Sequence, residues 1–149
     1  MTHRQPTVSV IIPSRLAPAA GSGERLFLED AVHSIGQQAT IGREHIQIVV
    51  GVDVGTVAPA GLAQRLRIEL VESGGRSQAA ALNAAAERAE GEFLAILEDD
   101  DIWDPKFLRT ALDALGKAEF ASSTAPPSRS RPRPPKTSGP SAKTSTAAA

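Results

Sequence analysis

Short, mostly apolar runs recur along the first hundred positions of this 149-residue chain. Valine, isoleucine and leucine dominate the runs, and each run is bounded by glycine, proline or charged residues. This pattern predicts strands over residues 7–12, 46–53, 67–71 and 92–97. Strands that are apolar along most of their length are typical of a parallel sheet whose two faces are both covered.

Helical patterns lie between these runs and after the last of them. Apolar residues recur at the spacing of one helix face at Leu28, Ala31, Val32 and Ile35, which predicts a helix that ends near Gly36. Residues 78–89 predict a second helix, in which the many alanines favour helix formation and would allow a close approach to a sheet. Asp104 and Pro105 suit the start of a third helix. Its apolar side would comprise Phe107, Leu108, Ala111, Leu112 and Leu115.

The order of these elements predicts an α/β fold with a mostly parallel sheet and helices on both faces. Residues 120–123 are interpreted as the start of a fifth strand, after which the pattern stops. The length allows one domain. We therefore expect residues 1–124 to form that domain and residues 125–149 to form a tail.

The charge of the chain is divided unevenly between these two parts. Residues 1–124 carry 11 basic and 17 acidic residues, whereas residues 125–149 carry five basic residues, no acidic residue and six prolines. Such a tail has too little apolar surface to offset its ordering entropy, so we expect disorder. The run at residues 131–135 suits an SH3-like partner, although a terminus without function is the simpler interpretation. No aromatic residue accompanies the basic ones, so no nucleic-acid partner is expected.

Cysteine is absent from the chain, which excludes disulfides, thiolate zinc sites and cysteine nucleophiles. No stretch approaches the length of a membrane helix, and the apolar run at residues 8–12 is too short for a secretory leader. We therefore expect a cytoplasmic protein without an integral membrane segment.

Four consecutive acidic residues, Glu98, Asp99, Asp100 and Asp101, follow the fourth predicted strand. Carboxylates this close repel one another unless a cation or solvent offsets the repulsion. Ligands of α/β proteins bind at the carboxyl ends of strands, where oxygen ligands suit a divalent metal bound to a phosphate-bearing substrate. A solvated acidic loop is the alternative interpretation.

Three further polar residues are candidates for the same site. Asp53 leaves the second strand at the same edge, and it could accept from a pyrimidine base or a ribose hydroxyl, or merely form a turn. Arg76 lies in a Gly-rich turn and could bind a diphosphate, or simply be solvated. Asn83 lies in the alanine-rich helix, where it either points into a site or is exposed. Trp103 is expected to pack at the base of the acidic loop.

Several segments, taken in order, resemble the family 2 glycosyltransferases, which have the GT-A fold. Residues 8–14 are similar to the opening strand of that family. Residues 49–56 resemble its second strand and Asp-Asp-Gly-Ser ending, with a valine in place of the second Asp. Residues 75–83 resemble its Gly-rich turn and the helix that follows. Residues 89–103 are similar to its Ala-x-Gly-Glu strand and Asp-x-Asp-Asp-x-Trp metal motif, with glutamate in place of the first Asp.

The resemblance covers roughly residues 7–124 and implies a Rossmann-like, GT-A-like domain that binds a nucleotide diphosphate sugar. It implies a metal ion, Mn²⁺ or Mg²⁺, and inverting transfer of the sugar to an acceptor hydroxyl. The expected metal ligands are Asp100, Glu98 and Asp101. The expected nucleotide-sugar contacts are Pro13, Ser14, Asp53, Arg76, Asn83, Glu98 and Asp99.

The catalytic base is not identified by the resemblance. In the family, the acceptor site and the base come from a second half that lies downstream of the acidic motif. Here the tail of residues 125–149 contains no Asp, Glu or His. We therefore expect a domain that is incomplete at its C-terminus, with an unknown acceptor, that binds a donor weakly and transfers sugar slowly or not at all.

Two rival interpretations stay open. Residues 18–26 resemble the phosphate-cradling loop of nucleotidyltransferases. Against this, residues 13–17 separate that loop from its strand, and the first lysine of the chain is Lys106. The other rival is a truncated nucleotide-binding module without catalytic activity.

Overall fold

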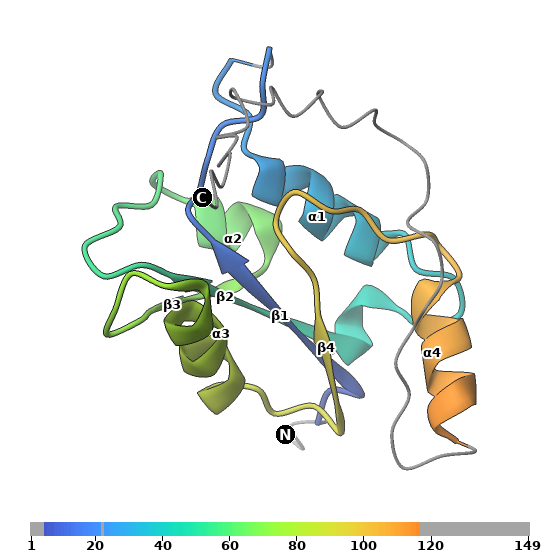
Figure 1. The fold of residues 1–149 in the computed structure, drawn as a ribbon. Helices are drawn as coiled ribbons and strands as arrows, with labels where there is room; N and C mark the ends of the chain where they lie inside the picture. The colour runs from blue at the N-terminus through green and yellow to red at the C-terminus, as the bar shows by residue number, and fades with distance from the viewer. Residues whose placement is uncertain (1–4, 22, 117–149) are drawn as a thin grey trace, which may run out of the picture.

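The computed structural model describes residues 5–21 and 23–116 (Figure 1). The strands are β1 (Val8–Ser14), β2 (Ile46–Val52), β3 (Glu69–Glu72) and β4 (Phe93–Ile96). The helices are α1 (Phe27–Gly36), α2 (Leu62–Leu66), α3 (Gln78–Glu87) and α4 (Phe107–Leu115), with a 3-10 helix at Arg43–His45. The expected fifth strand and tail lie outside the described residues. Within the described residues, no helix is both long enough and apolar enough to cross a membrane.

The four strands form one parallel sheet in the order β3-β2-β1-β4. The first strand of the chain therefore lies inside the sheet, where Val8 is opposite Ile46 of β2 and Phe93 of β4. At the other side, Val49 of β2 is opposite Glu69 of β3. The predicted parallel sheet is confirmed, and all four strands end at the same edge, which we call the carboxyl edge.

Helices cover both faces of the sheet, as the pattern predicted. Even-numbered residues of β1 and β2 point to one face because side chains alternate along a strand. There they pack with α1, α2 and α4 in a core that includes Val10, Ile12, Ile48, Leu28, Ile35, Leu62 and Leu108. On the opposite face, Ile11 and Val49 pack against Ala85 of α3.

The alanines of α3 do allow a close approach to the sheet. A Cβ atom added to Gly51 of β2 would lie 2.0 Å from the carbonyl oxygen of Ala81. Ala81 and Ala85 are both buried at this contact. The first turn of α3, which Ser77 caps through its hydroxyl, is thereby fixed close to the carboxyl edge.

Strand β1 extends beyond the residues 7–12 that the apolar pattern predicted, through Pro13 to Ser14, and coincides with the residues 8–14 that resemble the opening strand of the family. The carbonyl oxygen of Ile11 accepts from Leu97 N, so the backbone of odd-numbered β1 residues faces β4. Pro13 also faces β4 but has no N–H to donate, so the ladder between β1 and β4 ends before it, and β4 itself ends at Ile96.

Most other predicted boundaries differ from the observed ones by one or two residues, and two of these differences have a clear local cause. Strand β3 begins at Glu69 rather than at residue 67, because Arg67 ends α2 in the left-handed region with φ 56°. Helix α4 begins at Phe107, because the carboxylate of Asp104 first accepts from Lys106 N, at 2.8 Å, in a turn. The five-residue helix α2 was not predicted.

Candidate functional site

The acidic turn after β4 brings three carboxylates together at the carboxyl edge. Glu98, Asp100 and Asp101 each offer an oxygen, and these oxygens lie within 4.8 Å of one another. The turn is closed by the backbone N–H of Asp101, which donates to the carbonyl of Glu98 at 3.1 Å. All three side chains are exposed. The structure therefore places all three expected metal ligands within reach of a single cation.

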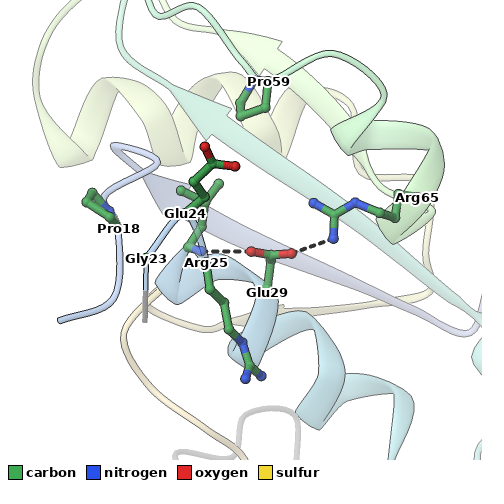
Figure 2. A pocket seen from close by; sticks show the side chains of 8 residues that line it. Pro18, Gly23, Glu24, Arg25, Glu29, Pro59 and Arg65 are labelled. Atoms are coloured by element: carbon green, nitrogen blue, oxygen red, sulfur yellow. Dashed lines mark hydrogen bonds and ion pairs between the residues drawn. The ribbon is translucent and has the colours of Figure 1, made fainter. Parts of the chain in front are cut away.

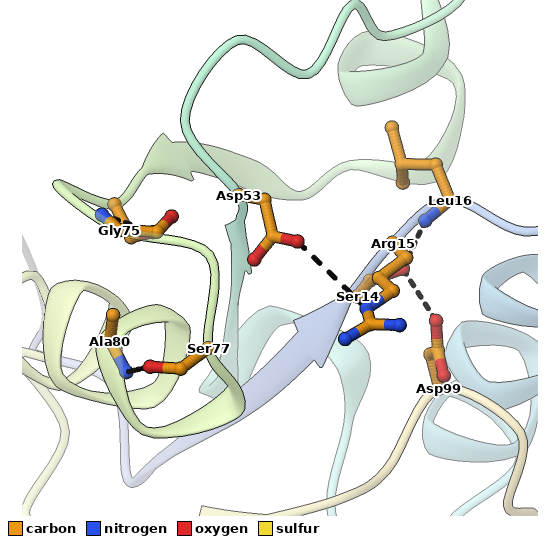
Figure 3. Close-up of polar contacts among 9 residues, drawn as sticks. Ser14, Arg15, Leu16, Asp53, Gly75, Ser77, Ala80 and Asp99 are labelled. Atoms are coloured by element: carbon orange, nitrogen blue, oxygen red, sulfur yellow. Dashed lines mark hydrogen bonds and ion pairs between the residues drawn. The ribbon is translucent and has the colours of Figure 1, made fainter.

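Asp99 differs from its three neighbours. Its carboxylate accepts from the Ser14 hydroxyl at 2.6 Å, and it is not a member of the group of three (Figure 3). Burial raises the pKa of Asp99, the bond from Ser14 opposes this, and the charge of Asp100 raises the pKa further. Asp99 was expected to contact the nucleotide sugar, whereas here its partner is the end of β1.

The expected wall from β1 is mostly buried. Pro13 and Ser14 are both buried, and the Ser14 hydroxyl also accepts from Leu16 N at 3.0 Å. Arg15 is the exposed residue at this strand end, with 80% of its side chain accessible. Sequence reasoning missed Arg15, although its position directly after a strand at the carboxyl edge was a usable signal.

Asp53 lies next to Arg15, at the end of β2. Its carboxylate is 3.8 Å from Arg15 Nε, and 23% of its side chain is accessible (Figure 3). The turns after β2 and β3 are held together by the bond from Val54 N to the Gly75 carbonyl, at 3.0 Å. The structure therefore brings the expected residue Asp53 beside the end of β1.

The two candidates from the α3 region are both exposed. Arg76 lies in the turn before α3, at the carboxyl edge, and Asn83 lies within the helix. Gln78 in the first turn of α3 donates from Nε2 to Glu98 Oε1 at 3.2 Å. Asn83 is five residues further along, about 7.5 Å up the helix axis from Gln78. Gln78, which sequence reasoning missed, is the α3 residue that contacts the acidic turn.

Trp103 anchors the acidic turn to the core, as predicted. It is buried, its backbone N–H donates to Ser34 Oγ at 3.1 Å, and its ring stacks on Phe107 with centroids 4.5 Å apart. The turn is therefore fixed at one end by β4 and at the other by the buried Trp103, which stacks on the half-buried Phe107.

A separate pocket of about 850 Å³ lies between the loop of residues 18–26 and α2 (Figure 2). Within that loop Pro18 pairs with Leu26, and Ala19 N donates to the Arg25 carbonyl at 2.7 Å. The residues that line the pocket are Pro18, Gly23, Glu24, Arg25, Leu26, Glu29, Pro59 and Arg65. Two carboxylates and two already paired guanidinium groups make this a poor cradle for a triphosphate.

Comparison with known proteins identifies the family. The family described as glycosyl transferase family 2 matches residues 9–139, most of the chain. The chain belongs to glycosyltransferase family 2. It is also 34% identical over 121 residues to TuaG of Bacillus subtilis (strain 168), whose name refers to a glycosyltransferase of teichuronic acid biosynthesis. The aligned region is 77% of this chain and 44% of TuaG, so the chain spans less than half of that relative.

Solved structures share the fold of this glycosyltransferase domain. S. aureus TarS 1–349 superposes with a TM-score of 0.59 at 19% identity, covering 74% of this chain and 32% of TarS. The same protein solved with UDP gives 0.59 at 20% identity. The mannosyltransferase PcManGT of Pyrobaculum calidifontis, solved with GDP-Man and Mn²⁺, gives 0.56 at 25% identity, covering 76% of this chain and 33% of PcManGT. The expected GT-A-like fold is confirmed.

Two residues of this family 2 domain depart from the motifs that it resembles. Val54 replaces the second carboxylate of the Asp-Asp-Gly-Ser ending, and it is 39% exposed beside Asp53. Glu98 replaces the first carboxylate of the metal motif, and its longer side chain meets Gln78 of α3. The first change removes a carboxylate from the β2 end of the edge, whereas the second retains a carboxylate.

Proposed function

We propose that this chain binds a nucleotide diphosphate sugar at the carboxyl edge, through a divalent cation, Mn²⁺ or Mg²⁺. The observation that carries the proposal is the set of three exposed carboxylate oxygens within 4.8 Å at the end of β4. Hard oxygen donors with room for water and phosphate ligands suit either ion. The Mn²⁺ and GDP-Man complex of PcManGT supports this choice of ligand class.

Each part of the edge has its own task in this proposal. Glu98, Asp100 and Asp101 would hold the cation, which would offset the charge that develops on the leaving diphosphate. Asp53, at the end of β2, would accept from the base or from a ribose hydroxyl. Arg76 is exposed at the same edge and is a candidate cation for the diphosphate.

Transfer with inversion further requires a base that takes the proton of the acceptor hydroxyl. Residues 125–149 contain no Asp, Glu or His that could serve. We therefore propose that residues 1–149 bind the donor but transfer sugar slowly or not at all. Robust turnover by the purified chain with any donor and acceptor would contradict this part of the proposal.

Calorimetric titration tests donor binding. The full chain would be titrated with UDP, GDP and dTDP sugars, with and without Mn²⁺. We expect Asp100→Ala to abolish the metal-dependent part of the affinity, because it removes a ligand from the group of three. The control is Asp113→Ala, which removes an exposed carboxylate that is paired with Arg109 on α4, away from the edge.

Two outcomes would contradict the assignment of the site. One is an equal loss of binding in the Asp100 and Asp113 variants. The other is a wild-type chain whose affinity for every nucleotide sugar is the same with and without Mn²⁺.

A further inference from the structure

Asp99 is the one acidic residue of the turn that faces into the protein. Its carboxylate accepts from the Ser14 hydroxyl at 2.6 Å. Ser14 is the last residue of β1. In the metal motif that this chain resembles, Asp99 occupies the variable position, and the role expected for it was contact with the nucleotide sugar rather than support of the turn.

The segment that Asp99 holds is an unfavourable turn. Leu16 has φ 53°, a region that residues with a Cβ atom rarely adopt. Such a conformation persists only where the surroundings hold it in place. Here the Ser14 hydroxyl accepts from Leu16 N at 3.0 Å while it donates to Asp99. Ser14 thus links Asp99 to Leu16, the residue with the unfavourable backbone conformation, through one hydrogen bond to each.

This turn determines where Arg15 lies. Arg15 is directed outward, and its Nε is 3.8 Å from the Asp53 carboxylate. A continuous series of contacts therefore runs along the carboxyl edge, from Asp99 after β4, through the turn after β1, to Asp53 after β2 (Figure 3). Glu98 and Asp100, which flank Asp99 in the sequence, belong to the group of three carboxylates in the acidic turn. The same turn therefore carries both Asp99 and the candidate cation ligands.

We infer that Asp99 is a positioning residue, which fixes the acidic turn against the turn after β1 so that the cation ligands and the Asp53 end of the site keep one geometry. This role rests on the proposed function. Asp99 acts here through hydrogen bonds and is not itself a ligand of the cation. Outer partners of metal ligands typically change metal affinity by 10–100-fold when they are removed.

The test measures the affinity of the full chain for Mn²⁺, alone and with UDP or GDP, by calorimetry and by the electron paramagnetic resonance of unbound Mn²⁺. We expect Asp99→Ala and Ser14→Ala each to weaken Mn²⁺ binding by about 10-fold. Because the two residues act through one contact, the double variant should be no weaker than the singles. Asp99→Asn retains an acceptor for Ser14 and should stay within about 3-fold of wild type.

Asp113→Ala is the matched control, because it removes an exposed carboxylate at 3.0 Å from Arg109 on α4. Its Mn²⁺ affinity should equal that of wild type. Thermal unfolding of every variant separates a loss of folding from a loss of positioning. If Asp99→Ala does not fold, Ser14→Ala and Asp99→Asn still decide the question.

Two results would overturn the role of Asp99 while leaving the proposed function intact. An Asn variant as weak as the Ala variant would mean that the charge of Asp99 acts, either directly on the cation or through space. Unchanged Mn²⁺ affinity in Ser14→Ala, with only a lower melting temperature, would mean that the bond between Ser14 and Asp99 stabilises the fold without positioning the cation ligands. A wild-type chain that ignores Mn²⁺ with both nucleotides would instead overturn the proposed function, and this role with it.

Discussion

Ser9 of β1 lies in a polar cluster at the opposite end of the sheet from the acidic turn. Its hydroxyl donates to Gln47 Oε1 at 2.5 Å and accepts from Gly91 N at 2.8 Å. Gln47 in turn accepts from Glu90 N at 2.8 Å and donates to the Arg88 carbonyl at 3.0 Å. These bonds fix the chain between α3 and β4, so the Ala-x-Gly-Glu segment has a structural role at this end of the sheet.

Gly91→Ala should destabilise the protein, because a Cβ atom there would lie 2.4 Å from the backbone nitrogen of Ser9. We expect a loss of about 1–3 kcal/mol in the free energy of unfolding, measured in urea. Gly74→Ala is the control, since a Cβ at Gly74 would have nothing within 4 Å. Equal stabilities of the two variants would contradict the close approach at Gly91.

Glu29→Gln should show a pH-dependent loss of stability. Glu29 pairs with Arg65 of α2 and accepts from Leu26 N, at 2.7 Å, at the start of α1. The bond from Arg65 is the largest cause that lowers the pKa of Glu29 below its ordinary 4.5, followed by the bond from Leu26. At pH 7 we expect the variant to lose about 0.5–1 kcal/mol, because the pair is at the surface.

The sign of the pH effect follows from that lowered pKa. The folded state favours ionised Glu29, so its contribution is complete above the ordinary pKa of 4.5 and is lost as the pH falls through the lower, folded-state value. The stability gap between wild type and Glu29→Gln should therefore narrow toward pH 3, in urea unfolding at a series of pH values. Exposed Glu87 serves as the control, because Glu87→Gln should show no gap. A gap that is constant with pH would refute the ionic contribution.

At the scale of elements, the contact between α3 and β2 sets the position of one wall of the site. Helix α3 carries Gln78, which reaches Glu98, and it lies so close to β2 that only glycine fits at position 51. The small side chains of Ala81 and Ala85 fill the contact. The spacing between helix and sheet thus depends on three small residues.

Gly51→Ala should therefore be more harmful than an ordinary addition of one methyl group. The new Cβ would lie 2.0 Å from the backbone oxygen of Ala81, which a side-chain rotation cannot relieve. We expect a loss of about 3 kcal/mol in urea unfolding. Gly36→Ala, at the end of α1, has nothing within 4 Å and should leave stability equal or up to about 1 kcal/mol higher. A harmless Gly51→Ala would show that α3 is not held as described.

The elements that sequence reasoning could predict are those with a long, regular pattern. Strand β2 and helices α1 and α4 are marked by apolar periodicity, and the acidic turn was found because it directly follows an apolar run. Helix α2 has only five residues, and left-handed residues, Gly61 and Arg67, bound it on both sides, so no period could develop. The apolar pattern missed the end of β1 because it does not show that β4 stops short of Pro13.

The site was predictable as a set of residues but not as an arrangement. Glu98, Asp100 and Asp101 are close in sequence, so their proximity follows from local geometry. The contact between Ser14 and Asp99 joins positions that are 85 residues apart and depends on the register of β1 against β4. Burial alone distinguishes Asp99 from its neighbours, and burial is a property of the folded sheet.

At the scale of the whole molecule, the β4 side of the sheet is unlike the rest. Leu94 and Ile96 are 53% and 57% exposed. They lie on the same face of the sheet as α3, but α3 packs against β1 and β2 rather than over β4. Their register opposite Ser9 and Ile11 places them on that face. In the part of the chain that the structure describes, β4 has one strand neighbour, β1. The chain spans 44% of TuaG, 32% of TarS 1–349 and 33% of PcManGT.

The position of β1 inside the sheet has a consequence for biosynthesis. Strand β1 is synthesised before both of its neighbours, and it must wait for the second of them until residues 93–96 have been translated. Closing so long a loop is slow, and until then one border of β1 stays open to wrong pairing in the nascent polypeptide. The bond between Ser14 and Asp99, 85 positions apart, can form only after that closure. Any pause in translation before codon 99 thus leaves the acidic turn after β4 unconnected to the end of β1.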